Sequence, residues 1–224
     1  MNYFSTVISL LSDRQQFLTE IHDRVKLKSK ISSLLLSSFC LFAIYGAIIG
    51  TFHSPLQAIS SAIKLPALYL ITLLVCLPTL YIFNALFGAK QTITQHFTYL
   101  LTAVTIIAVL LFGFAPVALF FLITINDYPF FVLLNVVIFS LTGIMGVSFL
   151  YRIMKPLDND DNAQNIKVRT KILQFWLILY GFVGSQLGWT LRPFFGTSGN
   201  FELFRPREGT FFSAVLNVLV DLLF

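Results

Sequence analysis

The sequence has little charge and few reactive side chains. Only 11% of its 224 residues are charged, and it holds 3 histidines and 2 cysteines. An ordinary soluble domain carries about 25% charged residues. A soluble fold of this size could not cover so much apolar area with so few charges, so the composition argues against a soluble enzyme. It also excludes a disordered chain, a collagen-like fibre and a nucleic-acid-binding domain.

The reactive residues show no catalytic or metal-binding spacing. Cys40 and Cys76 lie inside apolar runs, and no C-x-x-C pair or Cys/His cluster is present. Neither a disulfide framework nor a zinc site is therefore expected. G-x-S-x-G and H-E-x-x-H patterns are also lacking. We expect no catalytic residue, no cofactor and no metal site.

Long apolar runs make up most of the chain. Hydrophobic residues account for 57% of it, with 25 phenylalanines, and a helix needs roughly 20 apolar residues to cross a bilayer core. Five windows meet this length, and none contains Asp, Glu, Lys, Arg or His. The predicted fold is therefore an all-α, polytopic membrane helix bundle of five spans. The windows are 31–50, 65–87, 97–122, 130–151 and 172–189.

A sixth apolar stretch, Thr210 to Phe224, is shorter than the others. It has 15 residues and carries Asp221. This length is typical of an interfacial or re-entrant helix. A sixth crossing remains the alternative, because charged residues near span ends can reach the headgroups.

Lysine and arginine are concentrated in two segments, before the first span and between the fourth and fifth. A cytoplasmic N-terminus places eleven of these residues on the cytoplasmic side and four on the other. Positive residues are enriched in cytoplasmic connections. We therefore predict that the N-terminus is cytoplasmic. The assignment places Lys64 and His96 in connections.

Residues 1–30 are predicted to be a cytoplasmic amphipathic segment at the membrane interface. Within it, Asp13 to Lys30 is expected to form one helix that feeds the first span. Phe17, Ile21 and Val25 share one face, and basic residues crowd the rest. Such helices lie on anionic membrane surfaces. Lipid sensing, partner docking and a simple topology anchor all remain open.

Small residues, prolines and amides mark the five-span region, 31–189. Glycine stripes let helices approach closely, either within one subunit or between copies. Pro78 and Pro116 each remove a backbone hydrogen bond and are expected to kink their helices. Asn84 is a large polar residue at predicted membrane depth. The glycines of the stripes are Gly46, Gly50, Gly181, Gly184 and Gly188.

The tail, residues 190–224, combines arginine, proline and aromatic residues. We expect either an ordered structural cap or a site where arginines bind a lipid phosphate or another anion. The candidate residues are Arg192, Glu202, Arg205, Arg207 and Glu208.

Two resemblances follow from these features. The run G-W-x-L-R-P-F-x-G at 188–196, followed by F-R-P-R-E, resembles a C-terminal signature of uncharacterised multi-pass bacterial membrane proteins. That resemblance implies a bacterial inner membrane and no particular activity. The five-span plan is similar in outline to Yip1-domain proteins, without a shared motif.

The expected function is structural. Because ionisable residues are absent from the windows, proton-coupled chemistry loses support. We predict a non-enzymatic membrane protein that acts as a scaffold or accessory subunit of a membrane assembly. The alternative is a channel or permease component formed by oligomerisation. The expected partners are membrane lipids and either further copies of the chain or other membrane proteins, with no nucleic acid.

Overall fold

The computed structural model describes residues 3–52, 54–86, 91–125, 127–154, 163–191 and 194. These residues form seven α-helices, and no strand occurs among them. The helices are α1 (Tyr3–Ser12), α2 (Arg14–His22), α3 (Leu27–Gly50), α4 (Pro55–Leu86), α5 (Ile93–Thr124), α6 (Tyr128–Met154) and α7 (Ala163–Thr190).

Five of these helices, α3 to α7, are long and apolar enough to cross a membrane. This confirms the predicted five-span, all-α architecture. The helices extend beyond the apolar windows: α4 and α5 have 32 residues each, which is about 48 Å of helix against a hydrocarbon core of about 30 Å. Their ends therefore reach past the hydrocarbon. The stretch Thr210 to Phe224 lies outside the described residues.

Local capping signals determine where several helices begin. The Ser54 hydroxyl accepts a hydrogen bond from the backbone N–H of Gln57 at 3.2 Å. Pro55 follows Ser54 at the first helical position of α4. Proline suits that position because the first amides of a helix have no partner within it. Thr92 and Gln95 form a reciprocal capping box at the start of α5. These short polar sequences therefore mark where α4 and α5 begin.

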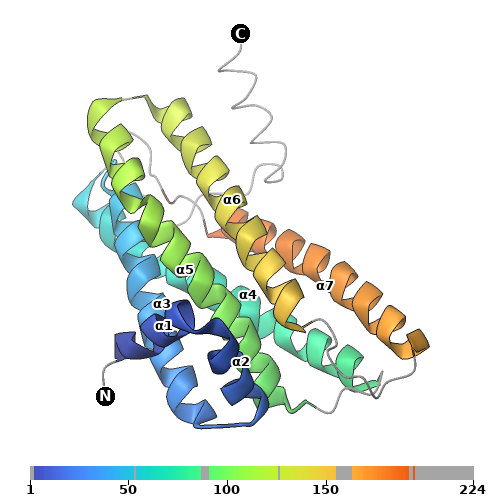
Figure 1. Cartoon of the computed structure of the whole chain (residues 1–224). Coiled ribbons are helices and arrows are strands. Elements are labelled where there is room, and N and C mark those ends of the chain that lie inside the picture. Colours follow the sequence, from blue (N-terminus) through green and yellow to red (C-terminus); the bar gives the residue numbers. More distant parts are fainter. Residues whose placement is uncertain are drawn as a thin grey trace.

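Successive spans run in opposite directions (Figure 1). α3 packs most extensively against α4 and α5, α6 packs against α5, and α7 packs against α4. The core of α3 includes Leu34, Phe42, Tyr45 and Ile49, all fully buried. Phe42 also stacks on Tyr69 of α4, with ring centroids 4.3 Å apart. The two helices of the first hairpin are thus tightly joined.

α7 is the most peripheral span, and a tryptophan attaches it to α4. The indole N–H of Trp176 donates to the carbonyl of Cys76 at 3.1 Å. Further along the pair, Gly184 approaches Thr72 and Gly188 approaches Leu68. The contacts therefore run in antiparallel order along both helices.

The N-terminal residues form two short helices, α1 and α2, at one end of the bundle (Figure 1). The prediction of one continuous helix from Asp13 to Lys30 was wrong, because the helix breaks between α2 and α3. α2 ends at His22 and α3 begins at Leu27. Between them, Arg24 and Lys26 adopt positive φ angles of 61° and 49°. Left-handed residues cannot continue a right-handed helix, so the chain reverses direction here.

Candidate functional site

The candidate residues of the tail cannot be placed. Arg192, Glu202, Arg205, Arg207 and Glu208 all lie outside the described residues. Of the tail, the structure describes Thr190, Leu191 and Phe194. The backbone carbonyl of Phe194 accepts a hydrogen bond from the Ser61 hydroxyl of α4. The structural cap and the anion site both stay predictions.

The glycine stripes differ in what they face. A Cβ atom on Gly50 would lie 2.6 Å from the Gln57 oxygen and 2.7 Å from the Ala58 Cα, both backbone atoms of α4. Gly46 is equally close to the α4 backbone at Ser61. Gly184 and Gly188 are only in ordinary contact range of α4 side chains, and no atom of the described residues lies within 4 Å of a Cβ on Gly181. The first stripe therefore faces a neighbouring helix of the same chain.

The prolines and Asn84 do not gather into one cavity. Pro78 lies eight residues before the end of α4, and Pro116 lies eight residues before the end of α5. Because the two helices run in opposite directions, the prolines lie toward opposite ends of the bundle. Asn84 is buried only two residues before the end of α4. A shared site for these three residues gains no geometric support.

A buried amide joins two spans, the role expected of an amide at membrane depth. The hydroxyl of Tyr45 in α3 donates to Oδ1 of Asn135 in α6 at 2.8 Å. The Asn135 amide nitrogen in turn donates to the Phe131 carbonyl at 2.8 Å. Both side chains are fully buried. The amide is used for packing between helices.

Lys64 and His96 were wrongly assigned to connections. α4 begins at Pro55, ten residues before the apolar window, so Lys64 is a helix residue, and its side chain is buried. His96 lies in the first turn of α5 and is also buried. The windows missed both because hydropathy detects the apolar centre of a helix and not its polar ends. Ionisable side chains are therefore present within the helical bundle.

Lys64 also forms a Ser-x-x-Lys spacing with Ser61, so the expectation that the chain has no such catalytic spacing was wrong. This spacing occurs in serine hydrolases, where it places the nucleophile beside an amine. Here the Ser61 hydroxyl donates to the Phe194 carbonyl and lies 3.4 Å from the amide nitrogen of Gln57. Ser61 is also fully buried. The Ser61 hydroxyl is thus occupied by the Phe194 carbonyl and the Gln57 side-chain amide, and it is shielded from solvent. This environment does not favour a role for Ser61 as a nucleophile.

The N-terminal helices pack onto the bundle at the end where α3 and α5 begin. Val7, Leu10, Phe17 and Ile21 are buried there. Gln95 of α5 reaches across to the end of α2, and its amide nitrogen donates to the carbonyls of residues 21 and 22 at 3.3 and 2.8 Å. These bonds satisfy carbonyls that a helix end leaves open. The segment is thus built into the fold on at least one face.

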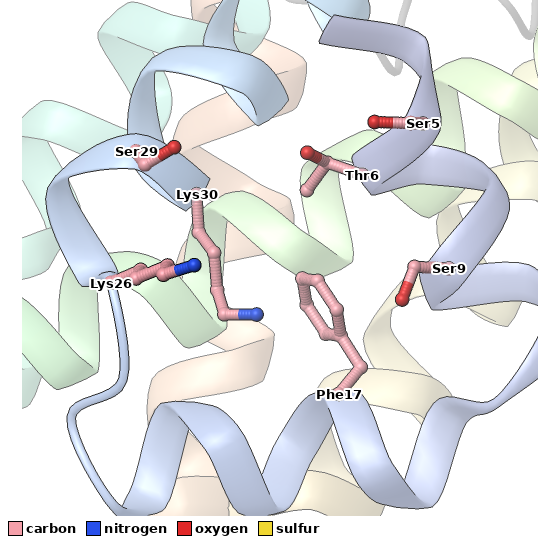
Figure 2. A pocket seen from close by; sticks show the side chains of 7 residues that line it. All are labelled: Ser5, Thr6, Ser9, Phe17, Lys26, Ser29 and Lys30. Carbon is pink, nitrogen blue, oxygen red and sulfur yellow. The ribbon is translucent and has the colours of Figure 1, made fainter. Parts of the chain in front are cut away.

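Two cavities open beside this N-terminal unit. The first, which we call the basic cavity, has a volume of about 200 Å³ and lies between α1, α2 and α3. Figure 2 shows hydroxyls from α1 on one side, with Lys26 of the turn before α3 and Lys30 of α3 on the other. Its lining residues are Ser5, Thr6, Ser9, Phe17, Lys26, Ser29 and Lys30.

The second cavity, which we call the outer cavity, has a volume of about 550 Å³ and adjoins the first. Lys26 and Ser29 line both. The outer cavity lies between the turn after α2, the start of α3 and the start of α5. Its lining residues are Arg24, Lys26, Leu27, Lys28, Ser29, Thr92 and Thr94.

Both cavities are rich in cations and hydroxyls. Lys30 forms an ion pair with Glu20, and its ammonium lies 4.4 Å from the centroid of the Phe17 ring. The salt bridges among described residues include none to Arg24, Lys26 or Lys28. Such a lining can bind an anion. The described residues contain no group of three His, Cys, Asp or Glu side chains that could hold a metal ion.

Comparison with known proteins adds no identity. No protein family matches the chain, and no curated protein or solved structure is significantly similar to it. The resemblances of the tail and of the five-span plan therefore stay predictions.

Proposed function

We propose that this protein is a non-enzymatic integral membrane protein, acting as a scaffold or accessory subunit of a membrane assembly. The supporting observation is how the spans use their polar groups. Tyr45 and Asn135 bond to each other, and the hydroxyls of Thr98, Thr102 and Thr105 donate to carbonyls of their own helix. The Tyr45–Asn135 bond joins two helices and the three threonine hydroxyls are satisfied within α5, so these groups support packing rather than a polar path.

The outward surface of the spans is consistent with this proposal. Ile82 and Ile144, with Phe120 and Phe175, are exposed on four different spans. Such apolar faces suit lipid tails or the spans of other membrane proteins. Partners of the chain would be membrane lipids and either further copies of itself or other membrane proteins.

The test combines a mass measurement with a flux assay. We expect the purified chain, reconstituted into vesicles, to conduct neither ions nor small solutes, because the buried side chains of Tyr45, Asn135 and the α5 threonines are engaged internally. The oligomeric mass and the partners that co-purify from the membrane would identify the assembly. Solute flux that is abolished by Asn84→Leu but not by the exposed control Leu86→Ala would contradict the scaffold. It would establish the channel alternative instead.

We further propose a bacterial inner membrane location with the N-terminus in the cytoplasm. The placement of cations supports this orientation. Arg24, Lys28, Arg152 and Lys171 lie at the bundle end that carries α1 and α2, whereas Lys64 lies toward the other end. Cations collect on the cytoplasmic side of membrane proteins.

Labelling of single cysteines tests this orientation. With Cys40 and Cys76 replaced by alanine, we expect Thr51→Cys to react with a membrane-impermeant maleimide in intact cells. Gln15→Cys is expected to react only after the cells are opened. Both positions are exposed, so accessibility alone does not distinguish them. The reverse labelling pattern would show that the N-terminus lies outside.

A further inference from the structure

The basic cavity has the lining of an anion site built from three helices. One ammonium group enters it from Lys26 in the turn before α3 and one from Lys30 of α3, and hydroxyls enter it from α1 and from Ser29 (Figure 2). Ammonium groups and hydroxyls can all donate hydrogen bonds. A volume of about 200 Å³ holds several water molecules, each of which occupies about 30 Å³ in the liquid. The cavity therefore has both the room and the donors for a small polar anion.

The local charge balance leaves net positive charge at this site. Glu20 forms an ion pair with Lys30. The Asp13 carboxylate accepts a hydrogen bond from the backbone N–H of Gln16 at the start of α2. The Asp23 carboxylate lies beside the His22 ring. Lys26 therefore brings an ammonium that none of these three carboxylates neutralises by an ion pair. Arg24 and Lys28 add two more cations in the adjoining outer cavity.

A phosphate group fits this lining better than a carboxylate. Its oxygens are spread around a tetrahedral centre and accept several hydrogen bonds, so donors that arrive from opposite walls can all be used. Charge-assisted hydrogen bonds from lysine to phosphate are among the stronger polar contacts. Lys26 and the α1 hydroxyls stand on opposite sides of the cavity (Figure 2).

The outer face of α1 indicates where the phosphate comes from. Phe4, Ile8 and Leu11 are exposed at 51%, 62% and 56% and follow one another at helical spacing. The Ser5 and Ser9 side chains line the cavity instead. An amphipathic helix of this kind buries its apolar stripe at the boundary between headgroups and acyl chains. The cavity is then brought to headgroup level.

We propose that the basic cavity binds the phosphate of an anionic phospholipid headgroup, with Lys26 as its principal cation and Thr6 as a hydroxyl partner. Lys26 also borders the outer cavity, which offers about 550 Å³ for the rest of the headgroup. The inference goes beyond the scaffold proposal and does not rest on it, because it uses only the N-terminal unit and the starts of α3 and α5.

The backbone of Lys26 makes a clean test possible. Lys26 has a φ of 49°, a conformation that glycine adopts without the steric cost a side chain incurs. Lys26→Gly therefore removes the ammonium without straining the turn. Lys171→Gln is the matched control, because it removes an exposed cation at the same end of the bundle but outside both cavities.

The experiment measures binding of dioctanoyl phosphatidic acid to the purified full chain in a neutral detergent. We expect Lys26→Gly to weaken binding about tenfold or more, the loss that corresponds to one charge-assisted hydrogen bond. Lys171→Gln should change it less than about twofold, as an exposed charge does. The melting temperature of Lys26→Gly should be no lower than that of the parent chain.

Three results would overturn the proposal. One is parental affinity in Lys26→Gly. Another is equal binding of dioctanoyl phosphatidylcholine, which would show partition without charge recognition. The third is inorganic phosphate competing at the same concentration as the lipid, which would assign the cavity to free phosphate. If Lys26→Gly does not fold, Thr6→Val serves instead, since it removes one hydroxyl at nearly constant shape, and unchanged affinity there would equally refute the lipid site.

Discussion

Replacement of Gly46 by alanine is expected to destabilise the protein by about 1–3 kcal/mol, the usual cost of overfilling a packed site. The added Cβ would lie 2.9 Å from the carbonyl carbon of Ser61 and 3.1 Å from the Cα of Ala62. These are backbone atoms, so no side-chain rotation can relieve the clash. α3 and α4 would have to separate along the most extensive helix contact of the bundle.

The measurement is the free energy of unfolding of the purified chain, obtained by titrating a denaturing detergent into a mild one. Gly113→Ala is the matched control, because none of the residues that the structure describes comes within 4 Å of a Cβ at that position in α5. Alanine is favoured over glycine in a helix by about 1 kcal/mol, so the control should keep or gain stability. Equal effects of the two substitutions would show that α3 and α4 do not approach as closely as described.

The second large effect is expected at Asn135. Asn135→Leu keeps the approximate shape of the side chain but leaves the buried Tyr45 hydroxyl without its acceptor. A buried polar group that loses its partner costs about 1–3 kcal/mol, although hydrogen bonds between membrane helices average only about 0.6 kcal/mol. We therefore expect Asn135→Leu to cost about 1–2 kcal/mol.

A double-mutant cycle checks the physical reason for that loss. Tyr45→Phe removes the hydroxyl, so Asn135→Leu should cost less in that background than in the parent chain. The readout is again the free energy of unfolding in mixed detergent micelles. Strictly additive losses would mean that Tyr45 and Asn135 do not interact, and that the substitution acts only through local packing.

If the lipid site exists, it would tie the N-terminal unit to the bilayer as well as to the bundle. Gln95 holds the end of α2, and α2 supplies Phe17 to the cavity wall. Lipid binding would then stabilise the same contacts that close this end of the protein. A scaffold that depends on anionic lipid for its shape would assemble only in a membrane that contains that lipid.

Hydropathy along the chain was enough to predict the membrane class and the five helices. Hydropathy is a local property that sums along a window, so each span could be recognised without knowing its neighbours. It did not locate the ends: α4 begins ten residues before its window, which is why Lys64 was misplaced. The reversal at residues 23–26 also escaped prediction, because neither Arg24 nor Lys26 is a residue type that marks a left-handed turn.

The tertiary structure alone decided which helix faces meet. In a membrane, faces toward lipid and faces toward another helix are both apolar, so hydropathy cannot distinguish them. Gly46 and Gly181 therefore look alike in sequence, yet a Cβ on Gly46 would meet α4, whereas no described neighbour comes within 4 Å of a Cβ on Gly181. In the same way, Ser5 and Lys26 line one cavity only because α1 folds back onto α3. The low charge content predicted a membrane protein, and the fold placed several of its few cations beside the two cavities.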